Sequence, residues 1–166
     1  MAASPLGTRQ ETIVSTAISA LTDAQLKQIL EESETIAVIG WSDNEDRPSH
    51  GVANYLRKQG YRVIPVNPRL AGERWGKQPI YGNVTEITRK VDLVDVFRRA
   101  DYTPAHAREA VEAGAGALWL QLGIANDETR RVAEESGLRY VEDKCTQIEH
   151  LRLIRGISMP SPPGGR

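Results

Sequence analysis

The stretch from 35 to 51, TIAVIGWSDNEDRPSHG, constrains the fold of this chain more than any other segment. It opens with a short, mostly apolar run typical of a buried strand, and the run stops at Gly40. After a polar loop Pro48 opens a helical pattern, at a position where the missing N–H of proline had no partner. A helix placed in this way directs its unpaired N–H groups at the carboxyl edge of the sheet. Phosphate is the ligand that suits such an edge best.

Strands and helices are predicted to alternate along the rest of the chain. The pattern predicts strands at 35–39, 62–66, 91–97, 117–122 and 138–141, and helices at 22–32, 48–59, 103–113, 126–137 and 146–153. The connection 70–90 is expected to hold a short strand near Ile80 and one helical turn at 84–88. This alternation predicts an α/β fold, a three-layer Rossmann-like, doubly wound parallel sheet of about five strands.

Composition bounds the class of protein. We expect one domain at 21–155, a flexible N-terminal arm at 1–20 and a disordered Pro/Gly-rich tail at 156–166. The 21 basic and 22 acidic residues leave a net charge of −1, which gives no global attraction to nucleic acid or to an anionic membrane. Cys145 is the single cysteine, so no internal disulfide can form. With no signal peptide and no apolar run of about 18 residues, a cytoplasmic monomer or homodimer is expected, with an unknown protein partner.

The first strand end differs from a standard dinucleotide site. The glycine that follows Gly40 is Gly51, so the GxGxxG spacing of NAD-binding turns is absent. Ser42, Ser49, His50 and the N–H groups after Pro48 could bind a diphosphate instead, with Arg47 as a charged donor. His50 could equally be a capping or surface histidine.

The next two strand ends carry arginine. NAD-specific domains place an acidic residue after the second strand, whereas this chain has Asn67-Pro68-Arg69. A neutral residue followed by Arg suits a phosphorylated ribose, as in NADP or in the 3′-phospho-ADP half of coenzyme A. The third end, Val96-Phe97-Arg98-Arg99, adds an aromatic surface and two guanidinium groups, although such a pair is also typical of a solvated helix start.

Several segments resemble the small bacterial CoA-binding proteins, a family related to the nucleotide-binding domain of the succinyl-CoA synthetase α subunit. The resemblance runs from about Leu26 to Leu153, on AVIGWS, RPSHGVANYLRKQGYRVIPVNP, DLVDVFRRADYTPAHAREAVEAGA, ALWLQLGI and EDKCTQIEH. It implies a Rossmann-like domain that binds coenzyme A or acyl-CoA, without catalysis, through the phosphoadenosine diphosphate portion. The chain ends where the synthetase continues into its phosphohistidine domain, so we expect no thioester synthesis by this chain alone.

The resemblance also implies which residues contact the cofactor. The phosphate turn would be Gly40, Trp41 and Ser42, and the diphosphate would face Arg47, Pro48, Ser49 and His50. The ribose and its 3′-phosphate would lie at Asn67, Pro68 and Arg69, the adenine beside Val96, Phe97 and Arg98, and the pantetheine arm along Gln121, Leu122 and Gly123. Two positions depart from the family pattern. Trp41 is bulkier than expected and could narrow the pocket or stack on a base, and Lys144 replaces an arginine.

The remaining candidates have structural interpretations. His106 and His150 lack a carboxylate or cysteine partner at a ligand spacing, so no metal site is expected, and no catalytic residue is predicted. Cys145 follows Lys144, a cation that could lower the pKa of the thiol, but a packed, inert thiol is the other interpretation. Trp119, within the apolar run ALWLQL, is expected in the core.

Two other functions remain open from the sequence. Arg69 would also suit an NAD(P)-binding redox sensor or a small oxidoreductase, although the GxGxxG turn is absent. A scaffold whose nucleotide site has decayed would be favoured if Trp41 filled the pocket.

Overall fold

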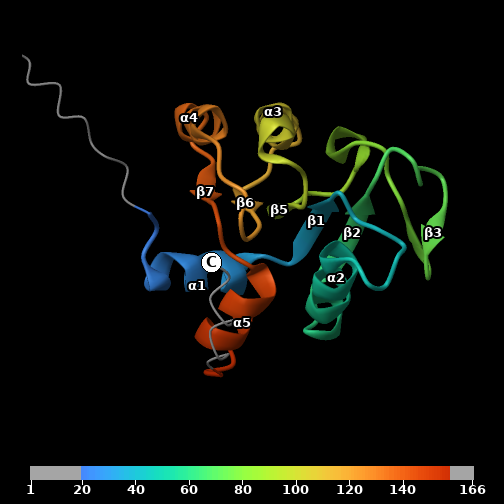
Figure 1. Cartoon of the computed structure of the whole chain (residues 1–166), viewed down its shortest axis with the longest axis horizontal. Coiled ribbons are helices and arrows are strands. Elements are labelled where there is room, and N and C mark those ends of the chain that lie inside the picture. Colours follow the sequence, from blue (N-terminus) through green and yellow to red (C-terminus); the bar gives the residue numbers. More distant parts are fainter. Residues whose placement is uncertain (1–19, 158–166) are drawn as a thin grey trace, which may run out of the picture.

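A computed structural model describes residues 20–157 of the chain (Figure 1). Residues 1–19 and 158–166 lie outside this range, and with them most of the expected flexible arm and disordered tail. The helices are α1 (Asp23–Glu32), α2 (Pro48–Lys58), α3 (Thr103–Glu112), α4 (Asp127–Glu135) and α5 (Thr146–Leu153), with 3-10 turns η1 (Val84–Glu86) and η2 (Ala100–Tyr102). The strands are β1 (Thr35–Ile39), β2 (Arg62–Val66), β3 (Arg74–Trp75), β4 (Gln78–Pro79), β5 (Leu93–Val96), β6 (Ala117–Leu120) and β7 (Arg139–Val141).

Five strands form one parallel sheet in the order β2-β1-β5-β6-β7. From β1 the chain passes outward to β2, then returns to the other side of β1 for β5, so the strand order reverses between β1 and β5. Ligands of open parallel sheets bind outside the carboxyl ends of the strands at such a reversal. The predicted fold class is confirmed, and the reversal lies between Gly40 and Phe97, the residues that follow β1 and β5.

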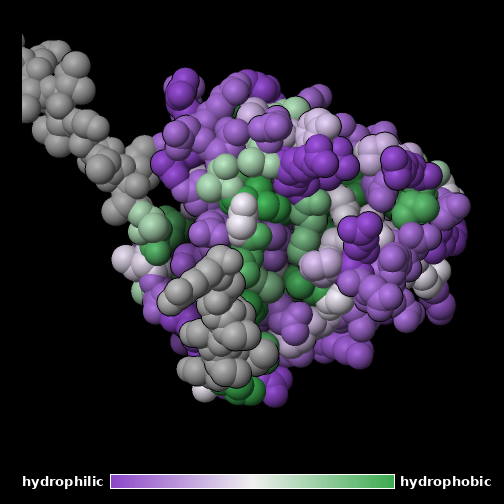
Figure 2. All heavy atoms as spheres, viewed as in Figure 1, coloured by the Kyte–Doolittle hydropathy of each residue, from purple (hydrophilic) through white to green (hydrophobic). Residues whose placement is uncertain are grey.

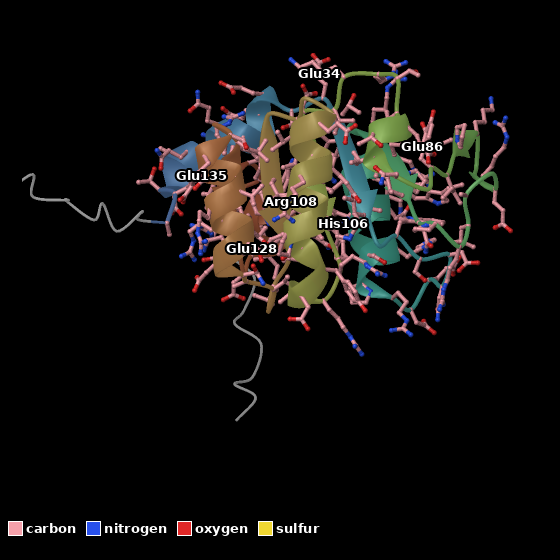
Figure 3. The ribbon with its side chains drawn as sticks, turned by 90° about the horizontal axis from the view of Figure 1, so that it is seen from above. Glu34, Glu86, His106, Arg108, Glu128 and Glu135 are labelled. Carbon is pink, nitrogen blue, oxygen red and sulfur yellow. The ribbon has the colours of Figure 1, made fainter. Side chains whose placement is uncertain are left out.

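Helices cover both faces of the sheet. Helices α1, α2 and α5 lie on one face, and α3 and α4 lie side by side on the other (Figures 1 and 3). Strand β1 shows why: Ile36 and Val38 are buried in the core cluster that includes Leu56 of α2, whereas Ala37 and Ile39 belong to a second cluster that includes α3 residues. A strand buried on both faces is a nearly continuous apolar run, as TIAVI is.

Local chemistry explains where the helices begin. Thr22 caps α1 in a capping box with Gln25, and Asn126 caps α4 by accepting the N–H of Thr129. On the outer helical layer Arg108 of α3 pairs with Glu128 of α4 at 2.7 Å, and both are labelled in Figure 3. An exposed pair of this kind adds little stability, so the two helices are held chiefly by the apolar cluster beneath them.

The predicted elements are present, with shorter strands. The strands expected at 91–97, 117–122 and 138–141 run over 93–96, 117–120 and 139–141. The connection 70–90 contains the antiparallel hairpin β3–β4 where only one short strand was expected, because two strands of two residues leave no periodicity in the sequence. The predicted turn at 84–88 is the 3-10 turn η1.

Hydrophilic side chains cover most of the face seen in Figure 2, and hydrophobic ones gather near its middle, between α5 and the layer of α3 and α4. Among the helices of residues 20–157, none combines the length and the apolar character needed to cross a bilayer.

Candidate functional site

A cavity of about 1190 Å³ lies at the carboxyl edge of the sheet. The residues that line it follow β1, β2, β5 and β6 or begin α2 and α5: Gly40, Trp41, Ser42, Arg47, Pro48, Ser49, Asn67, Pro68, Arg69, Phe97, Arg98, Arg99, Gln121, Leu122, Ile124, Cys145 and Ile148. We call this cavity the cleft. It brings together all the residues predicted to contact a cofactor except His50, Val96 and Gly123.

The turn after β1 requires glycine. Gly40 has a φ of 82°, and a Cβ atom there would collide with the carbonyl oxygen of Phe97. The Gly40 N–H donates to the carbonyl of Val66 on β2 at 3.0 Å. The turn is therefore fixed between its two neighbouring strands, at the point where the strand order reverses.

The Trp41 side chain is packed inside the protein. Only 2% of its surface is exposed, and its ring centroid lies 5.5 Å from that of His50 and 5.3 Å from that of Trp75. The guanidinium of Arg57 lies 3.8 Å from the centroid of Trp75. Trp41 thus leaves the cleft open, and the condition that would favour a decayed site, a pocket filled by Trp41, is not met. Its Nε1–H is buried with no hydrogen-bond partner among the described residues.

His50 supports the loop without lining the cleft. Its Nδ1 lies 2.9 Å from the carbonyl oxygen of Ser42, so Nδ1 carries a proton and donates it. The Ser42 hydroxyl accepts the N–H of Asn44 at 3.1 Å. These bonds hold the segment between β1 and α2 in one conformation.

The start of α2 leaves the amide hydrogen of Ser49 available among the described residues, because Pro48 has none and the N–H of His50 donates to the carbonyl of Arg47 at 3.0 Å. Arg47 occupies the N-cap position and makes no side-chain capping bond, and the first turn contains no acidic residue. Pro48 is the first helical residue, and Ser49 is buried beside the cleft. Because no acidic or capping side chain in this turn offsets the positive end of the helix, the helix start is suited to an anion.

Asn67 joins the ends of β1 and β2. Its Nδ2 donates to the carbonyl of Trp41 at 2.7 Å, and its Oδ1 accepts the backbone N–H of Arg69 at 2.9 Å. The sequence suggested a ribose contact for this residue, and the structure shows that its side chain is already used to shape the loop that carries Arg69.

Four arginines surround one part of the cleft. Arg47, Arg69, Arg98 and Arg99 form no ion pair with any residue in the described part of the chain, and the guanidinium of Arg98 lies 4.9 Å from the Tyr102 ring centroid. Other arginines, such as Arg130 and Arg152, do pair with carboxylates. The cleft is locally cationic in a protein of almost balanced charge.

The opposite part of the cleft carries no charged lining residue. It is formed by Gln121, Leu122, Ile124, Cys145 and Ile148. Arg99, Ile124, Cys145 and Ile148 were not among the predicted contacts. Cys145 and Ile148 lie three positions apart, a helical spacing that places both on one face at the start of α5, but only the packing of α5 brings that face to the cleft. Burial raises the pKa of the Cys145 thiol, so no low thiol pKa is supported.

Besides His50, two predicted contacts lie outside the lining, Val96 and Gly123. Val96 is fully buried in the cluster beneath α3 and α4, because alternate residues of a strand point to opposite faces. Gly123 lies in the chain between the lining residues Leu122 and Ile124, and its N–H donates to Asp143 Oδ1 at 2.7 Å. The expected burial of Trp119 is confirmed, with its Nε1–H donated to the Lys144 carbonyl at 2.8 Å.

The histidines away from the cleft have local partners. The expectation that His106 lacks a carboxylate partner is wrong, because its Nδ1 lies 2.9 Å from Glu109 Oε2, three residues further along α3. His150 Nδ1 lies 2.9 Å from the hydroxyl of Tyr55. Over residues 20–157 no three His, Cys, Asp or Glu side chains gather in a metal-binding cluster.

Comparisons with known proteins found relatives that match most of this chain. A family model described as CoA binding domain matches residues 34–151. The uncharacterized protein YneT of Bacillus subtilis is 38% identical over 127 residues, which are 76% of this chain and 93% of YneT. The solved structure of cell-free ID.343 from Thermus thermophilus is 38% identical with a TM-score of 0.77, over 80% of this chain and 99% of that one.

A more distant likeness concerns the fold alone. A dinucleotide-forming acetyl-coenzyme A synthetase of Ca. Korarchaeum cryptofilum matches with a TM-score of 0.56 at 23% identity. The match covers 64% of this chain and 25% of the synthetase chain.

Proposed function

The chain belongs to the CoA binding domain family, and on that premise we propose that it binds coenzyme A or an acyl-CoA in the cleft as a non-catalytic module. Family membership supports CoA binding in general. The location of the site and the role as a carrier, sensor or partner subunit are our proposal.

The observation that carries the proposal is the set of unpaired guanidinium groups beside an uncapped helix N-terminus. Coenzyme A has a diphosphate and a 3′-phosphate at one end, and both are well matched by arginine and by helix N–H groups. The cleft, at about 1190 Å³, also exceeds the roughly 300–1,000 Å³ of pockets that hold drug-sized ligands. It therefore has room for a long cofactor.

We assign the polar groups as follows. The diphosphate lies over the Gly40–Ser42 turn and the first turn of α2, with Arg47 beside it. Arg69 binds the 3′-phosphate, and Phe97 with Arg98 flanks the adenine. The pantetheine arm then runs past Gln121 toward Cys145. His50 and Asn67 act by fixing the loops that carry these groups.

An NADP-binding function is the second candidate, because Arg69 would suit a 2′-phosphate equally well. A decayed site is disfavoured, since Trp41 leaves the cleft open.

Thermal unfolding with different ligands tests the proposal. A ligand bound only by the folded state at 100 times its dissociation constant stabilises by about 2.7 kcal/mol. For a chain of this size we expect CoA to raise the Tm by roughly 5–10 °C, and NAD⁺ and NADPH to raise it far less. Equal shifts with all three, or none with CoA, would contradict CoA binding. A native mass spectrum of protein purified without added ligand would show any co-purified nucleotide and the subunit count.

A further inference from the structure

A carboxyl side chain lies inside the sheet beneath the cleft. Asp95, on the central strand β5, has no exposed surface. Its Oδ1 accepts a hydrogen bond from Gln121 Nε2 at 2.5 Å, and its Oδ2 accepts one from the Thr146 hydroxyl at 2.9 Å. Gln121 Nε2 also donates to the Thr146 hydroxyl oxygen at 2.9 Å. The three side chains, from β5, the end of β6 and the start of α5, form a closed buried network.

This network fixes the orientation of the Gln121 amide. The amide nitrogen faces Asp95 and the Thr146 hydroxyl oxygen, as an ionised carboxylate requires because it only accepts hydrogen bonds. Both amide hydrogens are then directed inward, one to Asp95 and one to Thr146. A reversed amide would place its oxygen against an ionised Asp95 and would take both amide hydrogens away from these two acceptors.

The carbonyl oxygen Oε1 is the polar atom that Gln121 has left for the cleft that it lines. No donor within residues 20–157 forms a hydrogen bond with it, and it is not among the buried atoms that lack partners. The neighbouring lining residues Leu122, Ile124 and Ile148 offer no side-chain donor. Gln121 Oε1 is thus a fixed acceptor in an uncharged part of the cleft.

The charge of the residues that line the cleft changes from one side of the sheet to the other. Its arginines come from the start of α2 and from the ends of β2 and β5, whereas the residues that follow β6 or begin α5 are uncharged. A polyanion fits the first part, and a neutral chain with a hydrogen-bond donor fits the second. A phosphate or carboxylate beside Gln121 would meet an oxygen acceptor and no cation.

We propose that Gln121 Oε1 accepts a hydrogen bond from an amide N–H in the arm of the ligand, and that Asp95 and Thr146 are positioning residues that aim it. This inference rests on the proposed CoA-binding function and adds the atom that holds the arm and the two buried residues that aim it. The site takes a molecule with a polyanionic nucleotide head and an uncharged, amide-bearing arm. The pantetheine arm of CoA has two such amide groups.

Two probes separate the arm from the head. Calorimetry would measure affinities for CoA and for adenosine 3′-phosphate 5′-diphosphate, which lacks the arm. In Gln121→Met, which keeps the length of the side chain, we expect CoA affinity to fall roughly tenfold, as for one lost hydrogen bond to a desolvated group. Affinity for the armless probe should stay unchanged, which would also show that the variant is folded.

A second variant tests the aiming of the amide. Thr146→Val removes one of the two acceptors that hold Nε2 but leaves Oε1 in the cleft. We expect a smaller, few-fold loss of CoA affinity and again no change for the armless probe. A merely structural role of Thr146 would lower both affinities together.

The outcomes are distinct. An unchanged CoA affinity in Gln121→Met, or equal losses for both probes, overturns this inference and leaves CoA binding intact. Failure of the unmodified protein to bind either probe overturns the proposed function, and this inference with it.

Discussion

Asn67 donates a 2.7 Å hydrogen bond to the carbonyl oxygen of Trp41 and so joins the loops that follow β2 and β1 at the floor of the cleft. Because the same side chain also accepts the N–H of Arg69, one residue sets the conformation of the turn and the position of a cation. The arrangement of the Trp41 turn and of Arg69 in the cleft therefore depends on the Asn67 side chain.

Replacement of Asn67 by alanine should therefore affect both stability and binding. The backbone groups left without partners should cost about 1–3 kcal/mol of unfolding free energy, and CoA affinity should fall as Arg69 loses its fixed position. Urea denaturation and calorimetry would measure the two effects. Asn54→Ala, which removes only an exposed bond to Arg57, is the matched control and should cost less than about 0.5 kcal/mol. Equal costs for both variants would contradict this role of Asn67.

Alanine at Gly40 should be far more harmful than alanine at Gly72. Both glycines have positive φ, 82° and 91°, but a Cβ at Gly40 meets the Phe97 carbonyl whereas nothing lies within 4 Å of one at Gly72. Gly72→Ala should cost about 1–3 kcal/mol for its backbone conformation alone. Gly40→Ala should exceed that by at least about 2 kcal/mol or fail to fold. Chemical denaturation at constant m value would compare them, and similar midpoints would refute the close approach.

Charge reversal at Arg69 tests the assignment of the 3′-phosphate. In Arg69→Glu, CoA should bind at least about tenfold more weakly, while dephospho-CoA should lose only a few-fold through the general field of the cleft. Arg62→Glu, at the exposed start of β2 on the opposite edge of the sheet, should change neither affinity. The same fractional loss for both ligands would remove the assignment.

The single cysteine offers a chemical test of where the ligand lies. Cys145 lines the cleft, and burial raises its thiol pKa, so alkylation by iodoacetamide should be slow near neutral pH and accelerate only at alkaline pH. Saturating CoA should protect the thiol several-fold. NAD⁺ at the same concentration should not, and alkylation after unfolding in urea gives the unprotected rate. A rate that CoA does not change would place the arm elsewhere.

Asp95 should make stability depend on pH. Burial raises the pKa of its carboxyl group to about 7, well above its usual value of 3.8, and the hydrogen bonds from Gln121 and Thr146 oppose this only in part. The unfolded chain then releases this proton at lower pH than the folded one. The stabilising contribution of protonated Asp95 is complete below about pH 4, falls as pH rises to about 7, and stays constant above that value.

Comparison with Asp95→Asn isolates this effect, because the other titrating groups are common to both proteins. The unfolding free energy of the original protein should fall relative to the variant between about pH 4 and 7, with a slope of no more than about 1.4 kcal/mol per pH unit. Urea titrations across this range would measure it. A constant difference would mean that Asp95 ionises normally.

Much of the fold was predictable because local signals agreed with the global arrangement. The run TIAVI ends at a glycine, Thr22 caps α1, and Gly60, with φ of 101°, follows α2. The cleft was predictable to the extent that it is built from strand ends, since parallel strands bring their carboxyl ends to one edge. This is why Ser42, Ser49 and Arg69 line one cavity.

The rest depends on contacts between distant segments. Nothing in the sequence around Ile148 shows that the first turn of α5 faces the cleft, and Val96 lies on the side of β5 away from it. The network of Asp95, Gln121 and Thr146 left one sign in the sequence, the acidic residue Asp95 within an otherwise apolar strand. Its partners are 26 and 51 residues away along the chain and could not be identified by spacing.

The aromatic cluster of Trp41, His50 and Trp75 affects how fast a ligand can bind. The three rings pack against one another and support the segment between β1 and α2, so this segment is already ordered before a ligand binds. Little conformational entropy is then lost on association. Encounter should be fast and similar for related nucleotides, and the protein should discriminate among them through how long each one stays bound.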